Sequence, residues 1–168
     1  TDSQITTTGG SLTIAGTATI NNTLSVSGGL LTANGTTSIQ KLILAAGTFS
    51  GSGAVTVAGT TNASTWSGGA LSGPGTLTVQ NGVTLNVSGN ATQTLARSLV
   101  NAGTLAYSGT NLVWSSASSL TLTNQSGATF NLQGNVAIKQ SGGAGLLTII
   151  NNGKTISSVV KRKSGNAV

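Results

Sequence analysis

The sequence lacks most of the side chains from which enzymes build active sites. Its 168 residues contain no His, Cys or Met, and Asp2 is the only acidic residue. Carboxylates, imidazoles and thiols carry most acid–base and nucleophilic chemistry near neutral pH. One Asp cannot form the carboxylate pair of a glycosidase, and ligand sets for zinc or calcium are missing. We therefore expect a protein that is not an enzyme, with no catalytic, metal-binding or cofactor-binding residue.

Charged and aromatic residues are also scarce. Charged residues make up 5% of the chain and aromatic residues 3%, and Pro74 is the only proline. A typical soluble domain has about 25% charged residues. Thr and Ser together supply roughly 30% of this chain, far above ordinary usage. The sequence therefore predicts a folded protein whose surface is covered by hydroxyl and amide groups.

The net charge of +6 comes from seven basic residues that form no dense cluster in the body of the chain. Three are scattered and four lie near the C-terminus: Lys41, Arg97, Lys139, and then Lys154, Lys161, Arg162 and Lys163. Nucleic-acid binders usually carry a dense basic face interleaved with aromatic residues. We therefore expect no nucleic-acid partner.

Long hydrophobic runs are absent as well. No apolar segment approaches the roughly 18 residues of a membrane-spanning helix, so we expect no membrane span. The first residues show no signal-peptide pattern, and a chain without Cys is compatible with secretion. We expect an extracellular or cell-surface protein whose signal peptide has been removed.

Apolar residues instead alternate with small polar ones in short runs. Examples are Leu24-Ser25-Val26, Val55-Thr56-Val57, Leu77-Thr78-Val79 and Leu120-Thr121-Leu122. A period of two is typical of strands that bury one face, and Gly, Asn or Ser follows almost every run. No segment of useful length has a helical period.

Glycines recur along the chain at intervals of about 18 to 21 residues, in the range of repeat architectures. The recurring positions are Gly9, Gly28, Gly47, Gly68, Gly89, Gly109 and Gly127. Short strands cannot bury an apolar face alone, but stacked coils of them close a narrow core. The sequence predicts one all-β domain over residues 1–168, a parallel β-helix (β-solenoid) of about 20 residues per coil. Roughly eight coils would form a rod on the order of 40 Å long. The alternative is a β-sandwich pilin with donor-strand exchange.

Two stretches show the repeat style best, residues 75–82 (GTLTVQNG) and 145–153 (GLLTIINNG). They resemble the parallel β-helix repeats of filamentous-haemagglutinin-type and autotransporter-type bacterial surface proteins. The resemblance covers most of the chain and consists of a degenerate repeat pattern. It implies a right-handed β-helix outside the cell, with a role in adhesion or fibre formation.

The two ends of such a rod are unpaired strand edges, and soluble solenoids normally cover them with capping structures. Neither end segment, 1–10 or 154–168, contains an amphipathic capping helix. Two explanations remain: the chain is part of something longer, or its ends pair with the next copy. In the second case Asp2 of one copy would approach Lys161, Arg162 and Lys163 of the next, and we treat these four residues as candidate subunit contacts.

These observations favour an extracellular structural subunit that associates with its own kind into a fibre or matrix. The alternative function is an adhesin segment that binds glycans or a host surface along its side. Trp66, Tyr107 and Trp114 are candidate sugar-stacking residues, with core or corner packing as the simpler account. Asn residues in Asn-x-Ser/Thr sequences, such as Asn124, mark turns or form amide ladders between coils.

Overall fold

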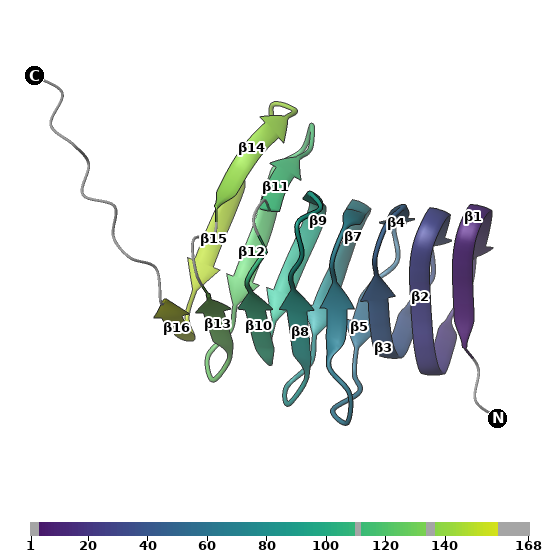
Figure 1. The fold of residues 1–168 in the computed structure, drawn as a ribbon, viewed down its shortest axis with the longest axis horizontal. Coiled ribbons are helices and arrows are strands. Elements are labelled where there is room, and N and C mark those ends of the chain that lie inside the picture. The colour runs from purple at the N-terminus through teal and green to yellow at the C-terminus, as the bar shows by residue number, and fades with distance from the viewer. Residues whose placement is uncertain (1–3, 110–111, 134–136, 158–168) are drawn as a thin grey trace, which may run out of the picture.

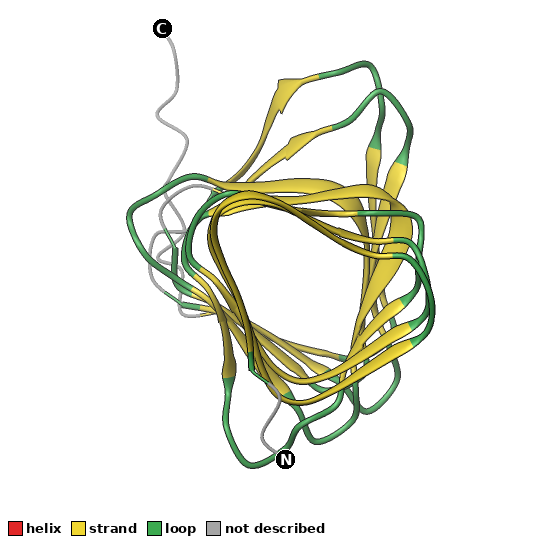
Figure 2. Cartoon of the chain, turned by 90° about the vertical axis from the view of Figure 1, so that its right-hand side faces the viewer, coloured by secondary structure: helices red, strands yellow, loops and turns green. Residues whose placement is uncertain are grey.

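The computed structural model describes residues 4–109, 112–133 and 137–157, and within them every regular element is a β-strand. The strands form one parallel sheet that winds into a β-solenoid of about seven turns, with roughly 22 residues per turn (Figures 1 and 2). The expected fold class is thus confirmed, with slightly fewer and longer coils than predicted. The strands are β1 (Ile5–Ile14), β2 (Ala18–Ala33), β3 (Thr37–Leu44), β4 (Thr48–Ser50), β5 (Val55–Val57), β6 (Ser64–Trp66), β7 (Gly69–Val79), β8 (Thr84–Val87), β9 (Gln93–Asn101), β10 (Thr104–Tyr107), β11 (Leu112–Ser115), β12 (Leu120–Asn124), β13 (Thr129–Leu132), β14 (Ile138–Gly142), β15 (Leu147–Asn151) and β16 (Lys154–Ser157).

Viewed along its axis, the solenoid has a roughly triangular outline with three sheet faces (Figure 2). The first face stacks β3, β6, β8, β10, β13 and β16, the second stacks β4, β11 and β14, and the third stacks β5, β12 and β15. The strands β7 and β9 each bend at a corner and contribute to two faces, and β2 bends at two corners and contributes to all three. These bends join the three faces into one continuous sheet.

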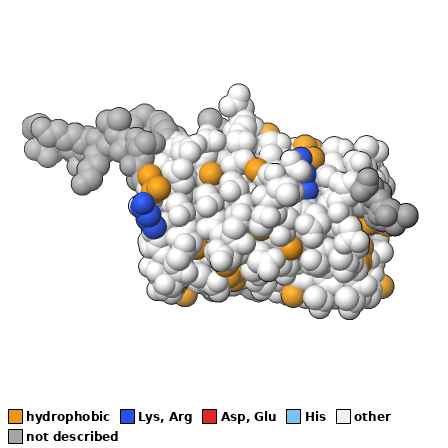
Figure 3. All heavy atoms as spheres, turned by 90° about the horizontal axis from the view of Figure 1, so that it is seen from below, with side chains coloured by type: hydrophobic (Ala, Val, Ile, Leu, Met, Phe, Trp, Pro, Cys, Tyr) orange, Lys and Arg blue, Asp and Glu red, His pale blue; other side chains and the backbone are white. Residues whose placement is uncertain are grey.

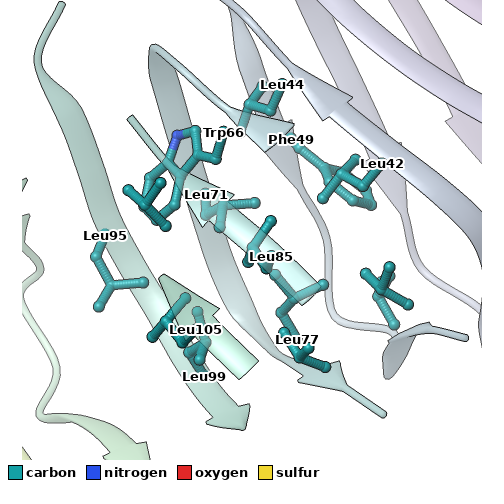
Figure 4. Close-up of a cluster of buried hydrophobic side chains, with 14 of the residues drawn as sticks. Leu42, Leu44, Phe49, Trp66, Leu71, Leu77, Leu85, Leu95, Leu99 and Leu105 are labelled. Carbon is teal, nitrogen blue, oxygen red and sulfur yellow. The ribbon is translucent and has the colours of Figure 1, made fainter. Parts of the chain in front are cut away.

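The alternating sequence pattern sets which side chains fill the lumen. In β9 the inward positions are buried and the intervening positions are half-buried, as a period of two requires. Leucine, isoleucine and valine from successive coils stack in columns, for example Leu24 on Leu42 and Val55 on Leu77. The close-up in Figure 4 shows this packing around Trp66 and Phe49. The columns form one hydrophobic core that runs through the rod.

The coils widen along the chain. Paired residues in the first coils are 18 or 19 positions apart, as in Ile5 with Leu24 and Leu24 with Leu42. Near the C-terminal end the separation reaches 26 and 27 positions, as in Leu112 with Ile138 and Leu120 with Leu147. The wide coils carry β11 and β14 outward beyond the outline of the others (Figures 1 and 2).

Glycine shapes the tight corners where backbones stack directly. Gly51 has a φ of 125°, and a Cβ placed on it would lie 2.0 Å from the carbonyl oxygen of Ala33 in the coil beneath. Only glycine fits such a conformation and such a close approach. Gly28 and Gly47, from the series that recurs at coil spacing, also lie too close to the backbone of the coil beneath to carry a Cβ.

Candidate assembly edges

One edge of the rod is formed by β1, which pairs only with β2 among the described strands. Leu12 of β1 aligns with Leu31 of β2, so both side chains face the lumen. Leu31 is fully buried, whereas 38% of Leu12 is exposed. Within the described residues, this edge therefore presents backbone groups without a strand partner together with an open apolar lumen.

The opposite edge is formed by β14, β15 and β16, each of which pairs with one strand of the coil before it. Ile149 of β15 aligns with Leu122 and faces the lumen, but it is 47% exposed while Leu122 is buried. In β16 the inward position opposite Phe130 holds Thr155, and Ile156 points outward. The C-terminal edge is therefore partly apolar and partly polar.

Exposed large hydrophobic side chains gather at these two ends. Those of the described residues lie either in the first two coils or in the last: Leu12, Leu30, Leu146, Ile149, Ile150 and Ile156. The middle coils of the described region contain none. Of these six residues, Leu12 and Ile149 occupy lumen positions that a further coil would cover.

A ladder of asparagines runs through the lumen to the C-terminal edge. Asn101 Nδ2 donates to Asn124 Oδ1 at 2.7 Å, and Asn124 Nδ2 donates to Asn151 Oδ1 at 2.7 Å. The side chain of Asn101 also donates to the Thr129 carbonyl and accepts from the Gly103 amide. The ladder satisfies buried amides that would otherwise be costly. It confirms the amide-ladder interpretation for Asn124.

Arg97 is fully buried in the lumen, at the inward position of β9 between Leu95 and Leu99. At this corner of the rod Gly53 and Gly75 lie one above the other, and Arg97 is the next residue in the same stack. Its Nε donates to the Gly75 carbonyl and its Nη2 to the Gly53 carbonyl, and its Cζ lies 5.7 Å from the centroid of the Phe49 ring. Burial lowers the pKa of the guanidinium to about 10. The two glycines lack side chains and so leave room for this group.

The candidate subunit contacts Asp2, Lys161, Arg162 and Lys163 lie outside the described residues. Their pairing across an interface therefore stays a prediction. The sequence analysis did not single out Leu12 or Ile149 as edge residues. Counting the alternating pattern outward from the central coils would have marked both as lumen positions of the end coils.

Two of the three candidate sugar-stacking residues are core residues. Trp66 is 1% exposed and packs beside Leu44 and Leu71 (Figure 4), and its Nε1 donates to the Gly69 carbonyl. Tyr107 is fully buried. Neither ring presents a face to solvent, so sugar stacking at these two positions is corrected to core packing.

The hydroxyl of Tyr107 has a structural role. It donates to the Ala137 carbonyl at 2.9 Å and accepts from the Leu112 amide at 2.7 Å. Burial raises the pKa of this phenol, and the two backbone hydrogen bonds partly oppose the change. The side chain thus ties β11 and the approach to β14 to the first face.

Trp114 lies in β11 in register with Leu95 and is partly buried against the core. Its indole nitrogen is buried without a hydrogen-bond partner. Most of this ring is used in packing, and sugar stacking at Trp114 stays a prediction.

No family model, curated protein or solved structure matches this chain. The described residues contain no helix long and apolar enough to cross a membrane.

Proposed function

We propose that this chain is a non-catalytic, extracellular structural subunit that associates end to end through its open strand edges. The observation that carries the proposal is the contrast between end and middle coils. Leu12 and Ile149 are exposed at the ends, while the lumen residues aligned with them, Leu31 and Leu122, are buried. Covering each exposed side chain with a further coil would contribute on the order of 1 kcal/mol.

The direction of the sheet defines how copies would meet. All pairings within the solenoid are parallel, so an added coil keeps the chain direction. The N-terminal edge of one copy then meets the C-terminal edge of the next. Such head-to-tail contact uses two different surfaces and continues into a filament unless rotation closes a ring. Backbone pairing supplies most of the affinity, as in other strand-addition interfaces.

A lysine at an inward edge position should block this contact. Replacing Ile149 with Lys places a charge where the next coil would pack, and the long side chain can reach water through the open end. We expect Ile149→Lys to raise the protein concentration needed for filaments about tenfold or more. The readouts are negative-stain electron microscopy and sedimentation velocity over a concentration series.

The matched control is Thr148→Lys, which adds the same charge on the same strand but on the outward face. It should change the concentration dependence less than about twofold. Wild-type filaments should show an axial repeat of about 34 Å, the height of seven stacked coils. Monodisperse rods at every concentration, disordered aggregates, or equal effects of the two lysines would each show that the proposal is wrong.

A further inference from the structure

A polar recess lies at one corner of the rod, where the third face turns into the first. In the first two coils this corner is tight. Asn21 and Asn22 of β2 form an irregular turn opposite Gln40 of β3. The third coil instead inserts residues 58–63 between β5 and β6. In Figure 1 the loops at this corner project from the lower edge of the rod. The step between tight turns and a longer loop creates the recess.

The longer loop is held at both of its ends. Gly59 is buried, and a Cβ on it would lie 2.0 Å from the Gln40 carbonyl oxygen, so the loop begins in direct contact with the turn below. Ser64 is buried where the loop ends, and its Oγ accepts a hydrogen bond from the Leu42 amide at 2.9 Å. The loop that forms one wall of the recess is therefore fixed at both ends. A fixed wall favours binding, because the loop loses little conformational entropy when a ligand binds.

The recess has a volume of about 480 Å³, within the range of small-ligand sites. Its lining is almost entirely polar and contains amide, hydroxyl and ammonium groups. The lining residues include Asn21, Asn22, Gln40, Lys41, Thr61 and Asn62. Amide and hydroxyl side chains both donate and accept hydrogen bonds, and this matches the repeated hydroxyls of a sugar.

The charge of the recess narrows the ligand further. Lys41 is its single cation, and the described residues contain no Asp or Glu to pair with it. The face seen in Figure 3 is mostly uncharged, with blue side chains in separate places and no red ones. A polyanion such as nucleic acid would need several cations along its path. A single cation among neutral hydrogen-bond donors and acceptors fits a ligand that places one carboxylate in the recess.

From this geometry we infer that the recess formed by residues 21–23, 40–41 and 61–62 binds an acidic saccharide, one that carries a carboxylate on its ring. The Lys41 ammonium holds the carboxylate, and the surrounding amides and hydroxyls hold the sugar hydroxyls. No aromatic ring lines the recess, so binding rests on hydrogen bonds and charge. A dissociation constant on the order of 1 mM follows for a single disaccharide.

The site is independent of end-to-end association. β1 contributes no lining residue, and neither does any strand of the C-terminal edge. Binding should therefore be the same in filaments and in isolated rods. Failure of the assembly proposal would leave this inference standing, and the reverse also holds.

Ligand-observed saturation-transfer NMR on the full chain tests the inference, because it works for filaments and for monomers. The probes are digalacturonate and the neutral digalactose of the same linkage. Protein made in the bacterial cytoplasm keeps Asn21 and Asn62, both in Asn-x-Ser/Thr sequences, free of glycans. We expect digalacturonate to bind about tenfold more tightly than the neutral sugar.

Two substitutions locate the site and one serves as the control. Lys41→Gln should remove the preference for the acidic sugar, and Asn62→Ala should weaken binding of both sugars. Lys139→Gln removes an exposed charge outside the recess and should change neither. Equal binding of the two sugars by the wild type, no saturation transfer to either, or an equal effect of Lys41→Gln and Lys139→Gln would overturn the inference.

Discussion

The N-terminal and C-terminal coils fill the lumen of the solenoid with different side chains. One lumen column of the third face makes the contrast plain, since its residues are aligned coil upon coil: Ile20, Ile39, Val57, Val79, Asn101, Asn124 and Asn151. The first four are apolar and the last three are amides. Along this column the spacing rises from 18 or 19 residues in the first coils to 22 at the change from Val79 to Asn101, and to 27 between Asn124 and Asn151.

The first coils fill the lumen with aliphatic side chains together with the rings of Phe49 and Trp66. The later coils place amides in the same column, and a buried polar group of this kind needs a hydrogen-bond partner. The asparagine ladder meets this condition, and the guanidinium of Arg97 meets it in part, because its Nη1 has no hydrogen-bond partner.

The largest effect is expected at a glycine that stacks directly on the coil beneath it. Gly51→Ala puts a Cβ into the backbone of the coil beneath at a φ of 125°. We expect it to destabilise the fold by about 4 kcal/mol or more, because backbone cannot move aside without shifting whole coils. Urea unfolding followed by circular dichroism measures the loss.

Gly127 is the matched control in the wide coils. Its φ of 82° also disfavours an L side chain, but a Cβ there would meet no atom within 4 Å. Gly127→Ala should cost only about 1 to 2 kcal/mol, the strain of the left-handed conformation alone. Similar losses for the two variants would show that the close approach of Gly51 to the coil beneath adds nothing to the strain of the left-handed conformation.

The sequence predicts the architecture well because two simple periods encode it. Alternation such as Val55-Thr56-Val57 defines strands with one buried face, and recurring glycines such as Gly28 and Gly47 mark successive coils. The number of coils was overestimated, since the glycine spacing omits residues that the later coils insert at corners. A segment such as 58–63 looks like an ordinary turn until its neighbours in the stack are known.

The second test removes the centre of the asparagine ladder. Asn124→Leu takes the Oδ1 acceptor from the buried side-chain amide of Asn101, and it also removes the donor shared by Asn151 Oδ1 and the Lys154 backbone carbonyl. Buried polar groups that lose their partner destabilise a protein, here by about 2 kcal/mol. The measurement is again the midpoint of urea unfolding, compared between proteins whose unfolding free energy depends equally steeply on urea concentration.

Asn131→Leu is the control for this change, since Asn131 lies on β13 of the same coil but on its outward face. It should alter stability by about 0.5 kcal/mol or less. If Asn124→Leu proved as mild as Asn131→Leu, the wide coils would tolerate apolar lumens as readily as the narrow ones.

Interior polar groups were harder to predict than the fold. The alternating pattern places Arg97 on the same face as Leu95 and Leu99, but a cation at such a position is usually exposed, so the pattern alone does not predict its burial. Its burial depends on Gly53 and Gly75, which precede it by 44 and 22 residues. For Trp66 and Tyr107 the sequence left sugar stacking and core packing open, and only the coil register distinguishes them.

The smallest expected effect concerns Arg97, and its sign is opposite to that of the other substitutions. Replacing a buried charge by an apolar side chain of similar length removes its desolvation cost. Arg97→Met should therefore stabilise the protein at pH 7 by about 1 to 2 kcal/mol. This is a net value, because the substitution also removes two hydrogen bonds to backbone carbonyls. Lys139→Met, at an exposed position, should have little effect.

The pH dependence of this gain tests its cause. Below pH 10 the guanidinium is charged in both the folded and the unfolded chain, so the wild type bears the full desolvation cost. Burial lowers the folded-state pKa of Arg97 to about 10. Above this pH the unfolded wild type binds more protons than the folded one, and wild-type stability rises relative to Arg97→Met. All other ionisable groups are the same in the two proteins, so their contributions cancel in the difference. The advantage of Arg97→Met should shrink between pH 9 and 11, about one unit on either side of that pKa. A constant advantage across that range would mean that packing, and not the buried charge, separates the two proteins.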